Sequence, residues 1–142
     1  MATFNKFQDF VDQLARGVHD WDAHTFKVAL TNSAPVNTNT ILSNITQISG
    51  TNGYTTGGTA TTVTVNEAAG TVTVSGTKVT FTASTGSMGP FQYAVLYNDS
   101  ATSPLDALVG WWDYGSAVTL ADTESFDVKF SGTDPGAIFT IA

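Results

Sequence analysis

The sequence predicts an all-β domain, mainly antiparallel, of the β-sandwich or jelly-roll kind, with an N-terminal α-helix and one short extra helix. Two observations lead to this prediction. From residue 59 to the C-terminus, short segments in which apolar and polar residues alternate are separated by clusters of Gly, Asn, Ser and Pro. Thr is the main polar residue of these segments, and its branched side chain suits strands.

One domain is expected over residues 1–142, made of a helical segment at residues 1–20 and a β-sandwich at residues 25–142. A chain of 142 residues with 42% hydrophobic residues can bury a core of its own. The sequence contains no internal repeat, no linker-like stretch and no low-complexity tail.

The N-terminal segment has the spacing of an amphipathic helix of about 13 residues. Thr3 can serve as its N-cap, and Gly17 follows Arg16 as a natural residue to end it. Its apolar residues are Phe4, Phe7, Val11 and Leu14, with Phe10 beside them. Such a stripe needs cover, either from one end of the sheet or from a neighbouring subunit.

Residues 26–58 combine one strand with irregular structure. Residues 26–31 alternate as a strand does, and a turn-rich connection follows. The isoleucines and leucine of residues 41–48 fit one short helical face, with Asn39 or Thr40 as cap. Residues 50–58 form a glycine-rich loop around Tyr54, of the kind that often makes contacts.

The remaining strands are expected at residues 59–65, 71–75, 78–84, 91–97, 108–114, 125–131 and 137–141. In the first two, Val63, Val65, Val72 and Val74 mark the inward faces.

Two tryptophans are adjacent in the most aromatic of these strands. Neighbouring side chains of a strand point to opposite faces, so Trp111 and Trp112 cannot both enter one core. Either the sheet is covered on both sides, or one tryptophan faces a partner. A sugar-stacking platform of Trp111, Trp112 and Tyr114 is an alternative, since flat aromatic faces suit pyranose rings.

The charge composition limits the partners. With 12 acidic against five basic residues, the net charge is −7, and no basic stripe can be formed. Direct binding to nucleic acid or to an anionic membrane is therefore not expected. The sequence has no cysteine, no apolar stretch long enough to span a bilayer, and no basic and apolar start typical of a secretory signal.

Residues that carry chemistry are few. His19 and His24, with Asp20 and Asp22 between them, match no known metal loop, and we expect a turn there. No G-x-S-x-G elbow is present. The S-x-x-K match at residues 75–78 lies between strands, where that motif does not function. Two carboxylate pairs, Asp122 with Glu124 and Asp113 with Asp127, are expected at the solvated surface. We expect no enzyme activity, no cofactor and no metal site.

Four segments of the sequence are distinctive: ATFNKFQDFV at residues 2–11, KVALTN at 27–32, GPFQYAVLYN at 89–98 and GWWDYG at 110–115. Together they resemble a family of small structural proteins of tailed bacteriophages. Within that family the chain looks most like a capsid decoration or cement protein. The resemblance implies a virion component made in the host bacterial cytoplasm, which sits on the outer head surface as a homotrimer and binds the major capsid protein.

The residues expected at such an interface come from the sequence pattern. They are Phe4, Phe7, Phe10, Tyr54 and one of Trp111 or Trp112. Two alternatives remain. One is a tail-tube or other tail subunit; tube proteins usually carry a long hairpin for ring closure, and none is evident here. The other is a carbohydrate-binding module of the head or of a fibre.

Overall fold

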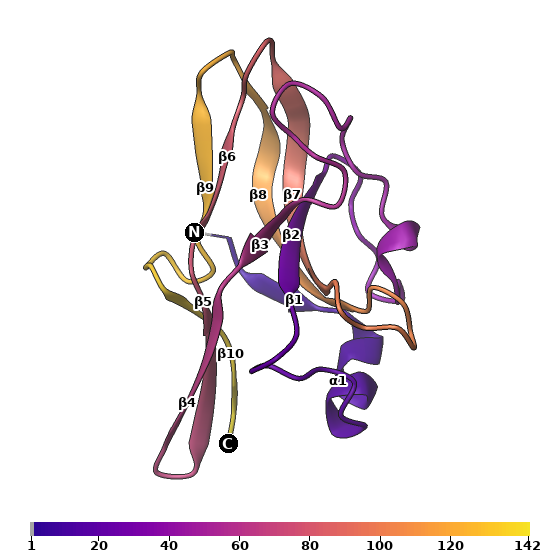
Figure 1. Cartoon of the computed structure of the whole chain (residues 1–142), viewed down its shortest axis with the longest axis vertical. Helices are drawn as coiled ribbons and strands as arrows, with labels where there is room; N and C mark the ends of the chain where they lie inside the picture. Colours follow the sequence, from indigo (N-terminus) through magenta and orange to yellow (C-terminus); the bar gives the residue numbers. More distant parts are fainter. Residues whose placement is uncertain (1) are drawn as a thin grey trace.

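The computed structural model describes residues 2–142 and confirms a mostly antiparallel all-β, sandwich-like domain with one α-helix (Figure 1). The elements are β1 (Phe4–Lys6), α1 (Gln8–Ala15), β2 (Phe26–Thr31), the 3₁₀ turn η1 (Leu42–Asn44), β3 (Thr59–Thr61), β4 (Val63–Ala68), β5 (Thr71–Gly76), β6 (Val79–Thr82), β7 (Met88–Asn98), β8 (Leu108–Leu120), β9 (Ser125–Val128) and β10 (Gly136–Ile141).

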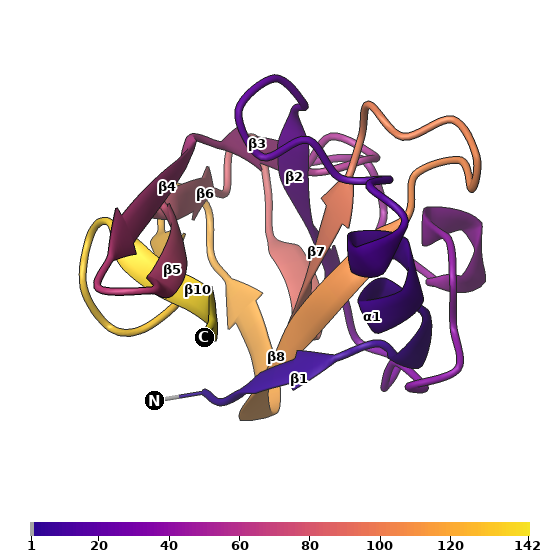
Figure 2. The ribbon, with the colours of Figure 1, turned by 90° about the horizontal axis from the view of Figure 1, so that it is seen from below.

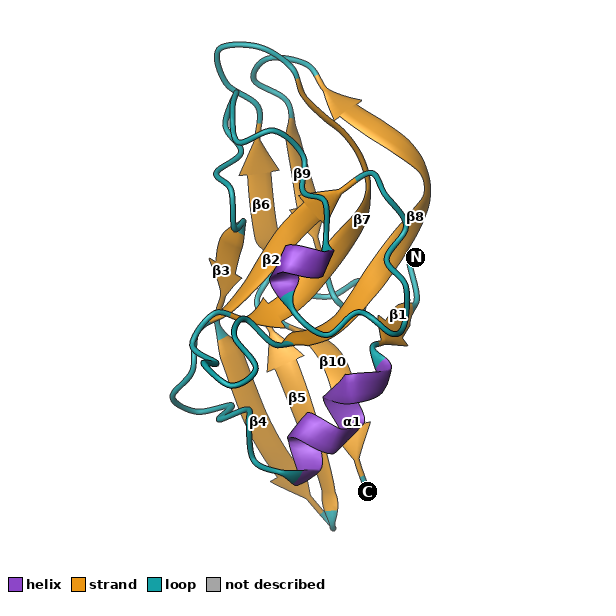
Figure 3. Ribbon diagram, turned by 90° about the vertical axis from the view of Figure 1, so that its right-hand side faces the viewer, coloured by secondary structure: helices purple, strands orange, loops and turns teal. Residues whose placement is uncertain are grey.

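The strands form three antiparallel sheets. The largest has the order β1-β8-β7-β2-β3, with β7 at its centre between β8 and β2. A two-stranded sheet of β6 and β9 lies over one half of it, and a three-stranded sheet of order β10-β5-β4 extends beyond the other half (Figures 1 and 3). Helix α1 lies next to β8 in the view from below (Figure 2), and its Phe10 reaches Phe139 of β10 with ring centres 5.3 Å apart.

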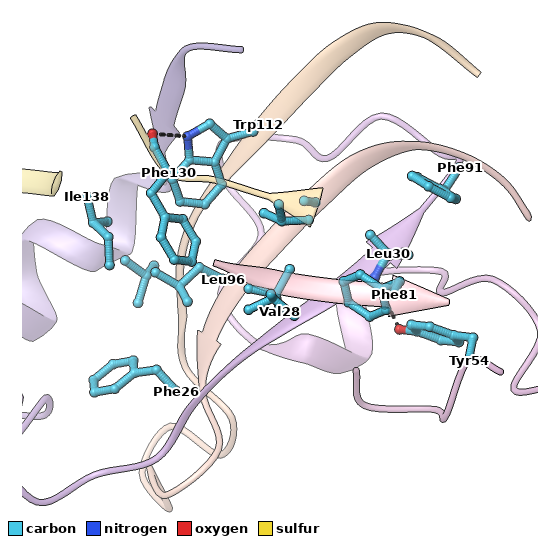
Figure 4. Packing of buried hydrophobic residues seen from close by; sticks show 14 of the residues in the cluster. Phe26, Val28, Leu30, Tyr54, Phe81, Phe91, Leu96, Trp112, Phe130 and Ile138 are labelled. Carbon is cyan, nitrogen blue, oxygen red and sulfur yellow. Dashed lines mark hydrogen bonds between the residues drawn. The ribbon is translucent and has the colours of Figure 1, made fainter. Parts of the chain in front are cut away.

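The main core fills the space between the five-stranded sheet and the two smaller ones (Figure 4). Trp112 packs on Phe130 with ring centres 5.0 Å apart, and its indole N–H donates to the Phe130 carbonyl oxygen at 3.3 Å. Val28 and Leu30 of β2 and Phe81 of β6 are also buried there. The core therefore joins all three sheets.

The opposite face of the five-stranded sheet carries a second, smaller core. Its buried members are Phe7, Ala29, Ile45, Val95, Tyr97 and Leu108. The β7–β8 register shifts between Leu96 and Tyr97, and this irregularity brings Leu108 onto the same face as Trp111. Both faces of the sheet are thus covered by the chain itself.

The predicted N-terminal helix is wrong at its start. Residues Phe4–Lys6 form β1, which pairs with the edge of β8, and the helix begins only at Gln8. Phe7, not Thr3, is the N-cap residue. Phe4 pairs with Trp112 across the strands, because covering that ring and closing the β8 edge is more favourable than three more helical residues. The expected end is confirmed, since Gly17 has φ +73°.

The predicted second helix is reduced to the single turn η1. The side-chain oxygen of Asn44 accepts hydrogen bonds from the backbone N–H of Thr40 at 3.0 Å and of Ile41 at 3.2 Å. The expected caps, Asn39 and Thr40, do not have that role. Ile41 instead forms a β-bridge with Ala107, which ties this segment to the β7–β8 loop.

The predicted strand at residues 59–65 is divided at Thr62 into β3 and β4. Strand β4 then forms with β5 a hairpin that projects from the body of the molecule (Figures 1 and 3). Val74, near the body, is buried as expected. Val65 lies directly opposite Val74 and so shares its face, as expected, but it is 41% exposed because β4 is the outer strand of the sheet. Within residues 2–142, no helix is long and apolar enough to cross a membrane.

The turn of this hairpin gives a stability prediction. Ala69 and Gly70 have φ of +51° and +83°, as a two-residue type I′ turn requires, and Ala is strained there. We expect Ala69→Asn to raise the free energy of unfolding by about 0.5–1 kcal/mol, measured by urea denaturation. Ala68→Asn, inside β4, is the control and should not stabilise. Equal effects of the two substitutions would contradict the strain at Ala69.

Candidate functional site

Most of the aromatic residues expected at an interface lie inside the chain. The buried ones are Phe7, Phe10, Tyr54 and Trp112. Phe4 and Trp111 are half-buried. The three phenylalanines share no common face, because Phe7 joins the smaller core, whereas Phe4 and Phe10 pack against the main one. Among the six candidates, only Phe4 and Trp111 keep surface that a partner could touch in this conformation.

Trp111 and Trp112 point to opposite faces, as strand geometry requires, and the chain covers both. Trp111 packs on Phe7 with ring centres 4.7 Å apart. Tyr114 packs edge-on against Phe126 at 4.9 Å on the Trp112 side. Burial raises the pKa of Tyr114 to about 12. The three rings therefore do not form one flat platform for a sugar.

Tyr54 anchors the glycine-rich loop instead of presenting it to a partner. Its hydroxyl donates to the side-chain oxygen of Gln47 at 2.7 Å and accepts from the backbone N–H of Leu30 at 3.1 Å. Gly57 N–H donates to the same Gln47 oxygen at 2.7 Å. Burial raises the pKa of Tyr54 to about 12. The role of Gln47 was not predicted from the sequence.

The two histidines meet at the end of β7. The side-chain amide nitrogen of Asn98 lies 3.0 Å from Nδ1 of His19 and 2.9 Å from Nδ1 of His24. Nε2 of His19 lies 3.1 Å from the side-chain oxygen of Gln13, on α1. Asn98 is fully buried, Gln13 is 2% exposed and His19 is 7% exposed. This cluster, the His19–Asn98–His24 network, connects the N-terminal segment to the central sheet.

The hydrogen bonds assign the tautomers of both rings. The Asn98 oxygen accepts from Ser100 N–H at 3.0 Å, so its NH₂ group faces the imidazoles and donates one hydrogen to each. Each Nδ1 is then an acceptor, and each neutral ring carries its proton on Nε2. Both Nδ1 lone pairs are thus occupied by hydrogen bonds that join the two rings to the end of β7. Among the described residues 2–142, no group of three or more His, Cys, Asp or Glu could hold a metal.

The remaining candidate groups also have local structural partners. Asp113 accepts from the side chain of Gln92 at 2.9 Å and from Gly115 N–H at 2.8 Å. These hydrogen bonds hold its pKa below the usual range. Glu124 accepts from Ala121 N–H at 2.7 Å in a turn. In the S-x-x-K match, Ser75 lies in β5, so the helix start that this motif needs is missing.

Two kinds of surface remain. A depression of about 270 Å³ beside β2 and β7 is lined by Asn32, Ser33, Thr46, Gln47, Ile48, Ser49, Gly89 and Pro90, none of which titrates. Among residues 2–142, the large exposed apolar side chains are Val11, Val36, Val65, Leu105 and Ile141. Val36 and Leu105 belong to two connections that we call the loop surface, residues 33–41 and 99–107. Their ends meet, since Leu42 N–H donates to the Asp106 carbonyl oxygen at 3.1 Å.

The fold and these surfaces define a small all-β domain in which the buried side chains of Gln13, His19 and Asn98 are joined by hydrogen bonds. Within residues 2–142, Trp21 Nε1 and the Tyr114 hydroxyl are buried without a hydrogen-bond partner. In comparisons with known proteins, no family model, no curated protein and no solved structure matches this chain.

The two tryptophans give a matched pair of substitutions. Trp112 is 1% exposed, so Trp112→Ala should lower the free energy of unfolding by about 3–5 kcal/mol, measured by chemical denaturation. Trp111→Ala should cost clearly less, because its ring is half-buried. Equal losses would contradict the different environments of the two rings.

His19 gives a pH prediction. Burial, with a smaller contribution from the charge of His24, lowers the pKa of His19 from 6.5 to about 4. Between these values the unfolded chain binds a proton that the folded chain does not bind. The free energy of unfolding should therefore fall by about 3 kcal/mol as the pH falls from about 6.5 to about 4.

The measurement is urea denaturation at several pH values, on the native chain and on His19→Gln. Glutamine keeps a donor and an acceptor but does not titrate, so the difference between the two profiles isolates His19 from the carboxylates. Parallel profiles would contradict the prediction.

Proposed function

We propose that this protein is a capsid decoration or cement protein of a tailed bacteriophage, which binds the outer head surface and stabilises the lattice of the major capsid protein. The proposal comes from the resemblance of residues 2–11, 27–32, 89–98 and 110–115 to small phage structural proteins. A homotrimer on the three-fold and quasi-three-fold sites is the assembly that this resemblance implies.

The structural observation that supports the proposal is that His19, His24 and Tyr54 hydrogen-bond within the chain. Both histidines accept hydrogen bonds from one buried amide, that of Asn98, and Tyr54 holds its own loop. What the chain offers to the outside is a sparsely charged, Thr-rich surface with apolar side chains on its loops. Such a surface loses little solvation free energy when another protein covers it.

The mechanism is mass action. A protein that binds only the assembled, expanded lattice lowers the free energy of that state relative to every disassembled one. The loop surface is our candidate for the capsid contact, because Leu105 is 60% exposed and Val36 is 56% exposed. Burying large exposed apolar side chains gives the largest favourable free energy of transfer out of water.

A tail subunit is the second candidate, and one observation favours it. The β4–β5 hairpin, which the sequence did not make evident, projects from the body as the ring-closing hairpins of tube proteins do. Immunogold labelling of native virions separates the two proposals, since head or tail would be decorated.

The test of head binding is co-sedimentation of the purified protein with heads that lack it, followed by heating. Native protein should bind and raise the temperature at which heads release DNA. Leu105→Asp should weaken binding by about tenfold or more, because a charge would be buried in the contact. Ile141→Asp, which alters a side chain 44% exposed in the third sheet, is the control and should bind as the native chain does.

If neither the native protein nor the control binds heads or changes their stability, the proposal is refuted. If Ile141→Asp loses binding while Leu105→Asp keeps it, the contact lies at the hairpin end of the molecule and not at the loop surface.

A further inference from the structure

Strand β4 is an open edge. Within residues 2–142 its one strand neighbour is β5, and in Figures 1 and 3 it forms the free border of the three-stranded sheet. Five of its six residues are exposed. An edge of this kind presents unpaired backbone N–H and C=O groups that another strand can satisfy.

The hairpin register identifies the backbone groups that point outward. Ala68 and Thr71 flank the two-residue turn and form a hydrogen-bonded pair. At the other end of the hairpin, Thr77 N–H donates to the Thr62 carbonyl oxygen at 3.0 Å, so another even-numbered residue bonds to the partner strand. Even-numbered residues of β4 therefore bond to β5. Val63, Val65 and Glu67 direct their N–H and C=O groups to the open side.

This edge lacks the features that usually prevent pairing. Strand β4 has no proline and no lysine, and its register with β5 is regular. The opposite edge of the sheet, β10, is interrupted by a register shift between Ala137 and Phe139. Of the two free edges, β4 is the one prepared to receive a strand.

Charge favours a second copy of this chain as the occupant. The chain carries a net charge of −7, so most faces of two copies repel each other. The 18 residues of β4, β5 and β10 include one charged side chain, Glu67. Its carboxylate accepts from Gly70 N–H at 2.7 Å at the turn. Copies can therefore approach at this sheet with the least repulsion.

We propose that β4 pairs antiparallel with β4 of a second copy, about a two-fold axis that passes between the two Val65 residues. This register places Val65 opposite Val65 and Val63 opposite Glu67, so all three outward-facing residues of each copy find hydrogen-bonding partners. The two Glu67 carboxylates are offset by four residues, roughly 13 Å along the strands, which exceeds the screening length of about 8 Å.

The side chains agree with the same register. Phe139 of β10 lies opposite Val74 of β5, and Val74 lies opposite Val65 of β4. Pairing of the two β4 strands extends this apolar row across a continuous six-stranded sheet. The exposed Val65 then gains an apolar neighbour on its open side. The bodies of the two copies lie at opposite ends of the paired hairpins, because the strands run antiparallel.

The inference does not depend on the proposed function, and it makes the chain a dimer where the resemblance implies a trimer. Icosahedral lattices have two-fold as well as three-fold axes, so a dimer still matches sites on a head. Pairing of a single six-residue strand buries little area, and we expect reversible association that depends on concentration.

The test places charges of either sign at residue 65, which lies opposite residue 65 of the second copy in the proposed register. Val65→Lys and Val65→Glu should each raise the dimer dissociation constant by about tenfold or more, since like charges meet at the axis. An equimolar mixture of the two variants should form heterodimers with a dissociation constant within about threefold of the native value. Sedimentation velocity over a concentration series measures all three.

Val36→Lys and Val36→Glu are the matched controls, because Val36 is similarly exposed but lies on the loop surface. They should dimerise as the native chain does, and near-UV circular dichroism checks that every variant folds. On the native chain, amide hydrogen exchange at Val63, Val65 and Glu67 should slow as concentration rises, whereas Thr64, already bonded to β5, should not change.

A native chain that stays monomeric at every concentration, or that forms trimers, overturns the proposal. Single variants that dimerise normally, or a mixture that fails to restore association, overturn it equally. Head binding is measured by separate co-sedimentation, so the two proposals can fail independently.

Discussion

The fold depends on covering both faces of the β7–β8 pair. Trp111 and Trp112 point to opposite sides of the same strand, and a five-stranded sheet with an aromatic ring on each side needs apolar partners on each side. The N-terminal segment supplies both partners within a few residues. It runs along the edge of β8 and places Phe4 against Trp112 and Phe7 against Trp111. The requirement for cover thus explains why a segment with helical spacing begins as a strand.

A second constraint acts at the end of β7, where a buried amide holds two imidazoles. Asn98 connects His19 and His24, and His19 extends the connection to Gln13 of α1. Burying these polar groups is tolerable because their hydrogen bonds are made within the chain. The network therefore holds residues 13–24 in place relative to the sheet. The aromatic contacts of Trp21 with Phe26 and Phe139 hold the same segment.

The sequence was sufficient for the strands, because alternation and turn residues are local signals. The prediction gives β2 its observed bounds and the other strands to within a few residues, except at Thr62, at the extended β7 and β8, and at β1, which the spacing predicts as helix. The sequence pattern is not sufficient where contacts with residues far away in the sequence determine the local structure. The spacing of Phe4 and Phe7 is helical, but Trp112 makes Phe4 a strand residue. Tyr54 is buried where its hydroxyl hydrogen-bonds to Gln47 and to the backbone of Leu30, and the sequence around Tyr54 does not predict these contacts. Likewise, nothing in the spacing of His19 and His24 reveals Asn98, which lies more than 70 residues away.

The open edge of β4 and the acidity of the chain have opposite effects on association: the edge favours it and the negative charge opposes it. An open edge without lysine or proline would promote association at any concentration if the rest of the surface were neutral. A net charge of −7, carried mainly outside the third sheet, opposes the approach of two copies except along that edge. Association through β4 is then weak for free molecules. It becomes strong when copies are held close together, because their high local concentration reduces the entropy lost on pairing. On the proposed head surface, the lattice itself would supply that concentration, so pairing would accompany decoration and would not precede it.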